Sequence, residues 1–151
     1  MSEAGYQCRE VIKKSLTWYE LPDSESAIRL LCMIAAHESG DFHYIHQSGG
    51  PAVSIFQMEP GSYDDICGYI KDRQEDFPRL IHDMPKPVDY MAFDPVYAAA
   101  VSRLYLLRIT DPLPQPEDID ALAQYAKIWW NTELGAAQWT DYRDAWLRHY
   151  G

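Results

Sequence analysis

The feature that most constrains the fold is a run of apolar residues in the first quarter of the chain. Residues 28–36 read Ile-Arg-Leu-Leu-Cys-Met-Ile-Ala-Ala, which is apolar nearly all the way round a helix. A helix without a broad polar face has to be covered on every side. Asp23 or Ser24 supplies its N-cap, and a Ser-Gly pair ends it. The stretch 25–38 is therefore predicted to be the central buried helix of a domain, with Glu38 in its last turn.

The rest of the chain also has helical periodicity. Apolar residues recur at helical spacing in further segments, several of which open at an aspartate or a proline. These helices are predicted at 6–19, 61–71, 76–83, 95–108, 117–130 and 137–149. The turn at Gly49-Gly50-Pro51 leaves room for at most a small β-hairpin near 51–57. No repeat or linker interrupts the pattern, so we predict an all-α single domain, residues 1–151, of six or seven helices.

The charge of the chain excludes some classes of partner. The 151 residues contain 23 acidic and 13 basic side chains, a formal net charge of −10. No basic cluster is present to neutralise phosphates, so neither nucleic acid nor an anionic membrane is expected as a partner. The first residues are polar and no apolar run approaches 18 residues, so we expect no signal peptide. The three cysteines are widely spaced and form no CxxC motif. Cys8 and Cys32 lie on apolar helical faces, which predicts buried free thiols and synthesis in a reducing compartment.

Aromatic residues make up 13% of the chain, with 5 Trp and 11 Tyr. Two interpretations stay open, because large rings either fill a small helical core or line a groove for sugars or peptides. Trp139, Tyr142 and Trp146 lie on one stripe of the last predicted helix. We predict that this stripe belongs to the core, and the alternative is a wall of a cleft.

Glu38 occupies an unusual position for a carboxylate. The C-terminal end of a helix is electrostatically unfavourable for a negative charge, and burial raises the pKa of a carboxyl group. A carboxyl group that stays neutral near pH 7 suits general acid catalysis. The alternative is a surface glutamate at a helix end. We predict that Glu38 is catalytic.

Three short motifs follow one another along the chain, and Glu38 belongs to the first of them. Glu38-Ser39 ends a helix, a glycine turn leads to Phe56-Gln57-Met58-Glu59-Pro60, and Trp130-Asn131-Thr132-Glu133-Leu134-Gly135 comes late in the chain. In this order they resemble the lytic transglycosylases of the lysozyme-like superfamily. That family has a glutamate-serine pair, a Leu-Met-Gln-type segment before a helix-opening proline, and an Ala-Tyr-Asn segment before a glycine. The resemblance covers about residues 24–146 and implies a lysozyme-like domain.

The resemblance also implies roles for individual residues. Ser39 would contact the glutamate or an N-acetyl group of the substrate, Gln57 would direct its amide toward the sugar or the glutamate, and Asn131 would bind substrate. Each has a local alternative, respectively a helix-stop serine, a hydrogen bond that fixes a loop, and a helix C-cap.

The sequence departs from the family at Trp130, where a tyrosine usually bonds the glutamate. An indole N–H donates a hydrogen bond but cannot accept one. Trp130 remains a substrate-binding candidate, and Tyr125 or Tyr44 is the expected substitute for the missing tyrosine.

The resemblance implies cleavage of the β-1,4 bond between N-acetylmuramic acid and N-acetylglucosamine in peptidoglycan glycan strands. The C6 hydroxyl of the substrate attacks, so Glu38 serves as the single acid and base and 1,6-anhydromuramic ends are formed. A hydrolytic lysozyme normally needs a second carboxylate, for which Glu59 and Asp41 are the nearby candidates. The runner-up function is such a lysozyme, using the same Glu38.

The lack of a signal peptide favours a bacteriophage enzyme, made in the host cytoplasm and acting on the cell wall. It would belong to the virion, with other virion proteins as partners, or to a lysis system. The alternative of another class is a non-catalytic virion component that kept the fold, which the Trp130 departure and the acidic surface favour.

Histidine and cysteine side chains suggest two other kinds of chemistry. His37, His43 and His46 lie near one another, as zinc ligands often do, but the HExxH pattern of a helical zinc site is missing. We predict that they line a groove or a solvated loop, and we expect neither metal nor cofactor. Cys32 has no activating neighbour in the sequence, so it is not expected to act as a nucleophile.

Overall fold

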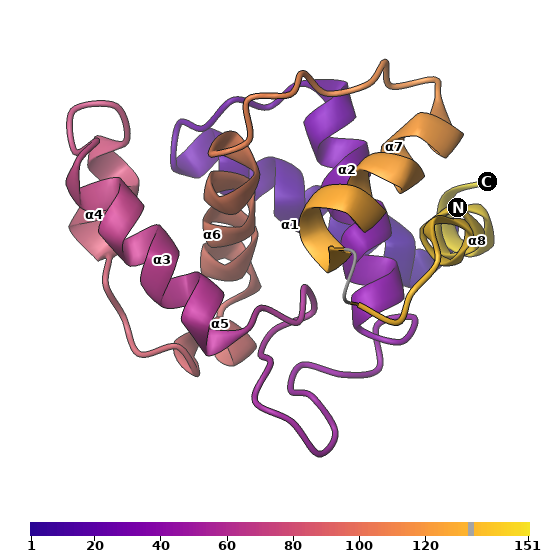
Figure 1. Cartoon of the computed structure of the whole chain (residues 1–151), viewed down its shortest axis with the longest axis horizontal. Helices are drawn as coiled ribbons and strands as arrows, with labels where there is room; N and C mark the ends of the chain where they lie inside the picture. The colour runs from indigo at the N-terminus through magenta and orange to yellow at the C-terminus, as the bar shows by residue number, and fades with distance from the viewer. Residues whose placement is uncertain (133–134) are drawn as a thin grey trace.

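A computed structural model describes residues 1–132 and 135–151, and in these residues the chain is all α (Figure 1). The prediction of an all-α domain is confirmed. The α-helices are α1 (Glu3–Trp18), α2 (Glu25–Glu38), α3 (Pro60–Lys71), α4 (Pro78–Asp83), α5 (Tyr90–Phe93), α6 (Pro95–Leu107), α7 (Ile119–Ala126) and α8 (Trp139–Tyr150). A π-helical turn, η1 (Lys127–Asn131), extends α7.

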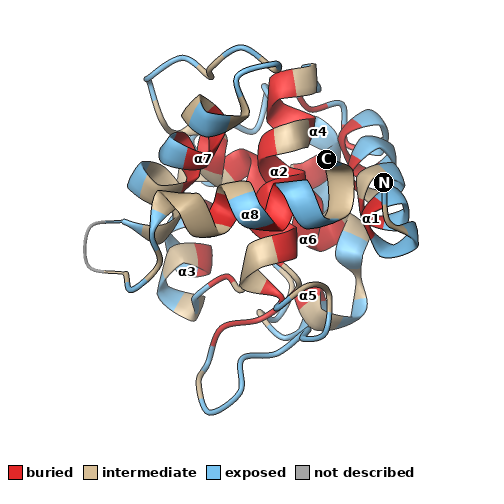
Figure 2. Ribbon diagram, turned by 90° about the vertical axis from the view of Figure 1, so that its right-hand side faces the viewer, coloured by how far each residue is buried: buried red, intermediate tan, exposed pale blue. Residues whose placement is uncertain are grey.

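Helix α2 is the centre of the domain, as its apolar sequence requires. Ten of its 14 residues are buried, and it contacts α1, α6, α7 and α8. Figure 2 shows the buried segments gathered along α2 and the helices that pack on it. Ser24 is the N-cap, because its hydroxyl accepts a hydrogen bond from the Ala27 N–H. The burial of α2 leaves its C-terminal residue, Glu38, at the edge of the core.

The other helices begin where local chemistry favours a helix start. Pro60, Pro78 and Pro95 stand in the first turn of α3, α4 and α6, where a missing N–H costs nothing. Asp94 caps α6 through the Tyr97 N–H. The four-residue helix α5 was not predicted, because one helical turn leaves no periodic pattern. The segment predicted as one helix over 117–130 is α-helical only to Ala126 and then widens into η1.

The segment between α2 and α3 extends beyond the helices at the bottom of Figure 1. It contains two isolated antiparallel bridges, His46 with Val53 and Val53 with Met58, and no strand. This agrees with the expectation of at most a small hairpin. None of the described helices has both the length and the apolar character that a membrane crossing needs.

Candidate active site

The carboxyl group of Glu38 meets a tyrosine hydroxyl from the last helix. Tyr142, in the first turns of α8, donates a hydrogen bond of 2.5 Å to Glu38 Oε1. Tyr142 is fully buried, and its ring packs against His37 at 4.5 Å between centroids. A hydroxyl-to-carboxylate bond of this length is charge-assisted and strong. The contact fixes the position of Glu38 at the end of α2.

Opposing influences act on the pKa of Glu38. Burial raises the pKa most, the Tyr142 hydrogen bond lowers it, and the negative charge of Glu59 raises it further. The net result is a pKa above the ordinary value of a glutamate. A carboxyl group with a raised pKa and a donor that also stabilises its ionised form can release a proton and take it back.

Glu59 stands at the start of α3, and its negative charge acts on Glu38. It is the N-cap residue of α3, but its side chain makes no capping hydrogen bond. With Gln57, Tyr105 and Trp130 it lines a small hollow of about 50 Å³. Trp130 packs edge-on against Tyr105 at 5.1 Å between ring centroids. Trp130 of the late motif is thus brought beside the segment 57–59.

Ser39 lies next to Glu38 in the chain, and its hydroxyl is engaged by the local backbone. The residue is fully buried, and its hydroxyl donates to the Ala35 carbonyl at 2.6 Å. The same oxygen accepts from the Phe42 N–H at 2.7 Å. This geometry is that of the local alternative, a serine that ends the helix and fixes the turn after Glu38.

Gln57 is held by its own loop. Its side-chain Nε2 donates to the Ser54 carbonyl at 2.8 Å. The backbone has φ +52°, a left-handed conformation that favours glycine or asparagine. The amide thus makes the loop-fixing hydrogen bond, while the side chain also borders the hollow with Glu59.

Asn131 lies at the end of η1, and its side chain acts to lower the pKa of Tyr142. Its Oδ1 accepts a 2.7 Å hydrogen bond from Lys127 Nζ. Burial nevertheless raises the net pKa of Tyr142 well above that of a free tyrosine, so the hydroxyl stays protonated. Glu133 and Leu134 of the third motif lie outside the described residues.

The tyrosine beside Glu38 is Tyr142, so the expectation of Tyr125 or Tyr44 in that place is wrong. The Tyr125 hydroxyl donates instead to the Asp111 carbonyl at 2.9 Å. Tyr44 is about half exposed and lies against Gly40 in the loop after α2. The one sequence signal that included Tyr142 was the aromatic stripe on the last helix. The prediction that this stripe belongs to the core is confirmed for Tyr142 and Trp146, which are buried.

Asp41, three residues beyond Glu38, is in a different electrostatic environment. Its Oδ1 accepts from His149 Nε2 at 2.8 Å and pairs with Arg148 at 3.0 Å. These partners outweigh the effect of partial burial and lower the pKa of Asp41. His149 Nδ1 also bonds the Ser2 hydroxyl at 2.7 Å. Arg148 and His149 therefore hold Asp41 in its ionised form.

The histidines near Glu38 are dispersed. Burial lowers the pKa of His37, which keeps its ring neutral against Tyr142. His43 bonds the Gly40 carbonyl at 2.7 Å, and His46 approaches Asp89 at 4.0 Å. Across residues 1–132 and 135–151, no three His, Cys, Asp or Glu side chains gather in a way that could hold a metal ion. Cys32 is fully buried on α2.

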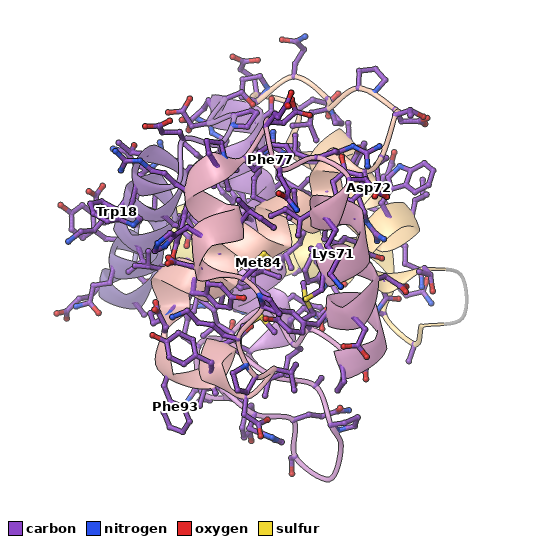
Figure 3. All side chains as sticks on the ribbon, turned by 90° about the vertical axis from the view of Figure 1, so that its left-hand side faces the viewer. Trp18, Lys71, Asp72, Phe77, Met84 and Phe93 are labelled. Atoms are coloured by element: carbon purple, nitrogen blue, oxygen red, sulfur yellow. The ribbon has the colours of Figure 1, made fainter. Side chains whose placement is uncertain are left out.

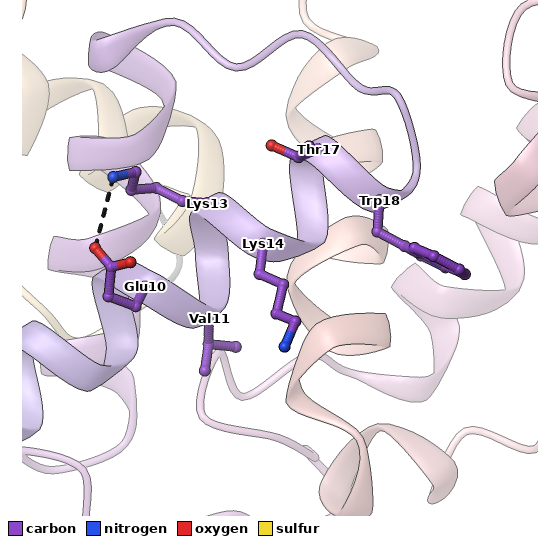
Figure 4. Close-up of a pocket in the computed structure, with 6 residues that line it drawn as sticks. All are labelled: Glu10, Val11, Lys13, Lys14, Thr17 and Trp18. Atoms are coloured by element: carbon purple, nitrogen blue, oxygen red, sulfur yellow. Dashed lines mark ion pairs between the residues drawn. The ribbon is translucent and has the colours of Figure 1, made fainter.

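Larger surface hollows lie away from Glu38. A hollow of about 590 Å³ runs along α1 between Glu10 and Trp18 (Figure 4). A second hollow, of about 520 Å³, lies between Trp18 and α4. Figure 3 shows Trp18 and Phe93 pointing outward at the rim of this face. Both hollows are open and lack a buried acid, so neither matches the Glu38 site in chemistry.

Among the carboxyl groups of residues 1–132 and 135–151, Glu38 alone combines burial, a raised pKa and a hydrogen-bond donor in a fixed position. No protein-family model, no curated protein and no solved structure matches the chain.

Proposed function

We propose that this protein cleaves the glycan strands of peptidoglycan as a lytic transglycosylase, and that it is encoded by a bacteriophage. The observation that carries the proposal is the state of Glu38, whose pKa is raised by burial while Tyr142 holds one of its oxygens. A single carboxyl group of this kind meets the demand of a reaction that uses one residue as both acid and base. The order of the three motifs supports the choice of substrate.

In this reaction Glu38 gives its proton to the glycosidic oxygen, and the bond from that oxygen to the muramyl C1 breaks. The C6 hydroxyl of the muramyl sugar then attacks C1, and its proton returns to Glu38. No water is consumed, and the acid is regenerated.

A hydrolytic lysozyme is the second candidate, favoured by Glu59. Its charge reaches Glu38, and its side chain is not engaged in capping α3. In that case Glu59 would activate the water that replaces the C6 hydroxyl.

The products separate the two reactions. Purified peptidoglycan is digested with the wild type, Glu38→Gln and Glu59→Gln, and the muropeptides are identified by mass spectrometry. We expect anhydromuropeptides, lighter by one water than ordinary ends, from the wild type and from Glu59→Gln. Reducing ends that disappear in Glu59→Gln would move the assignment to a hydrolase.

A matched control removes a carboxylate elsewhere on the surface. Glu75 is exposed in the turn between α3 and α4, so Glu75→Gln should keep wild-type activity. Activity that survives in Glu38→Gln would overturn the site assignment, provided that its circular dichroism matches that of the wild type.

A further inference from the structure

A serine, a histidine and an aspartate are linked where the first and last helices meet. The Ser2 hydroxyl oxygen lies 2.7 Å from His149 Nδ1, and His149 Nε2 lies 2.8 Å from Asp41 Oδ1. The three groups come from the N-cap of α1, the last turn of α8 and the turn after α2. A hydroxyl bonded to a base that is itself bonded to a carboxylate is the arrangement that activates serine for acyl transfer.

The backbone holds the serine against the histidine. Ser2 is the N-cap of α1, and its N–H donates to the His149 carbonyl at 2.8 Å. Gly5 is buried, and a Cβ atom at this position would lie 3.0 Å from both the Ser2 hydroxyl oxygen and the His149 carbonyl oxygen. A residue without a side chain at position 5 thus allows α1 and α8 to approach each other this closely.

The ionised carboxylate gives the hydrogen bonds a direction. It can only accept, so the contact with Asp41 requires a hydrogen on His149 Nε2. In the neutral ring Nδ1 then carries the lone pair, and the Ser2 hydroxyl is the donor across the 2.7 Å contact. The ring is turned relative to the best-known triads, in which serine meets Nε2, but the two nitrogens still divide the same two roles. Only 13% of the His149 side chain is exposed, so water has little access to the base.

We propose that Ser2 is a nucleophile that hydrolyses small carboxylic esters, with His149 as its base and Asp41 as the residue that positions His149. Ser2 Oγ attacks the carbonyl carbon of the ester as its proton passes to His149 Nδ1. The bond from that carbon to the alcohol oxygen breaks, and the alcohol leaves with the proton. Water then attacks the acyl-serine with the help of the same base, which releases the carboxylic acid and restores Ser2.

The first turn of α1 meets two further requirements of this reaction. Within residues 1–132 and 135–151, the N–H groups of Glu3 and Ala4 have no acceptor, and such groups can stabilise the negative oxygen of a tetrahedral intermediate. Both residues are exposed, so an ester can reach Ser2 from solvent. None of the hollows described above includes Ser2, which restricts the site to small acyl groups.

The first experiment compares two serines in matched positions. Ser2 and Ser24 both cap a helix, but among the described residues the Ser24 hydroxyl bonds only the Ala27 N–H. The whole protein is incubated with a biotin-tagged alkyl fluorophosphonate, which forms a P–O bond to an activated serine as its P–F bond breaks and HF leaves. Peptide mass spectrometry should find the label on Ser2 and not on Ser24. Labelling of neither serine, or of both to the same extent, would overturn the proposal.

Variants separate the nucleophile from the base. Ser2→Asn keeps a strong N-cap but removes the hydroxyl, so it should lose the initial burst of p-nitrophenol that an acyl-serine produces from p-nitrophenyl acetate. General-base catalysis commonly contributes about 10²- to 10⁴-fold, so His149→Gln should slow the labelling of Ser2 by at least about 100-fold. A burst that persists in Ser2→Asn would refute the assignment, and this variant decides the matter should circular dichroism show that His149→Gln does not fold.

The role of Asp41 has a separate readout. ¹⁵N NMR of the labelled His149 ring shows which nitrogen carries the hydrogen at about pH 9, above the ordinary pKa of an imidazole. We expect Nε2–H in the wild type. In Asp41→Asn we expect a mixture of tautomers, because an amide can donate or accept, and slower labelling of Ser2. An unchanged tautomer with unchanged labelling would remove Asp41 from the site. None of these measurements uses glycan cleavage, so each proposal can fail without the other.

Discussion

Glu38 and Asp41 lie three residues apart and both contact α8, but their pKa values are shifted in opposite directions. Glu38 receives one neutral hydroxyl from the start of α8, whereas Asp41 receives Arg148 and His149 from its end. Burial dominates at Glu38 and raises its pKa, while cationic partners dominate at Asp41 and lower its pKa. The nature of the partner and the access of water decide which carboxyl group can serve as an acid.

The largest expected effect is on the rate of glycan cleavage, and it tests whether Glu38 is needed for this reaction while Asp41 is not. Replacement of a general acid commonly costs about 10²- to 10⁴-fold in rate, so Glu38→Gln should lose at least that much muropeptide release. Asp41→Asn should stay within a few-fold of the wild type. Asparagine tolerates the left-handed backbone found at residue 41, with φ +59°. Equal losses in both variants would remove the distinction.

The second effect concerns the hydroxyl of Tyr142. Tyr142→Phe should reduce cleavage by about 10- to 100-fold through loss of orientation. The hydroxyl lowers the pKa of Glu38, so its removal should move the alkaline limb of the pH–rate profile to higher pH. Arg148→Met, the matched change at the other end of α8, should leave that limb in place. A limb that moves in both variants would contradict the separation of the two sites.

The third effect is on the free energy of unfolding. Ionisation of the carboxyl group stabilises the fold at Asp41 and destabilises it at Glu38. Because the pKa of Asp41 is lowered on folding, its contribution is present above the unfolded value of about 4 and is lost as the pH falls. Asp41→Asn should therefore reduce the free energy of unfolding at pH 7 by about 0.2–1 kcal/mol, as expected for partly exposed pairs. In urea denaturation the deficit should shrink toward pH 3.

Glu38 should behave in the reverse way. A pKa raised on folding gives stability that is complete below the unfolded value of about 4.3 and is lost as the pH rises through the folded value. Glu38→Gln should thus unfold at a melting temperature at or above that of the wild type at pH 7. A clear loss of stability at that pH would mean that the ionised carboxylate is structurally required.

The smallest effect is that of salt. At about 1 M salt the Debye length is about 3 Å, which screens exposed ion pairs. The stability difference between wild type and Asp41→Asn should therefore diminish, while that between wild type and Tyr142→Phe should persist. Melting temperatures at low and high salt provide the comparison.

Much of the fold could be predicted because its signals are local. The apolar run 28–36, the cap at Ser24 and the prolines at 60 and 95 each act within a few residues. Helix α5 and the π-helical turn were missed, since both are single turns whose geometry depends on neighbours.

Only the part of the candidate site that depends on local sequence could be predicted. The position of Glu38 at the end of a buried helix follows from local sequence. Tyr142 lies 104 residues away along the chain, and an aromatic stripe does not say which hydroxyl points at an acid.

The N-terminal and C-terminal helices are joined where the Ser2 N–H donates to the His149 carbonyl at 2.8 Å. A short peptide could therefore connect residue 151 to residue 1, with new ends opened in the exposed turn at 72–76. In such a circular permutant α8 would precede α1, and the separation of Tyr142 and Glu38 along the chain would fall from 104 residues to about half that number. The two helices that meet at the acid would then belong to the same half of the chain.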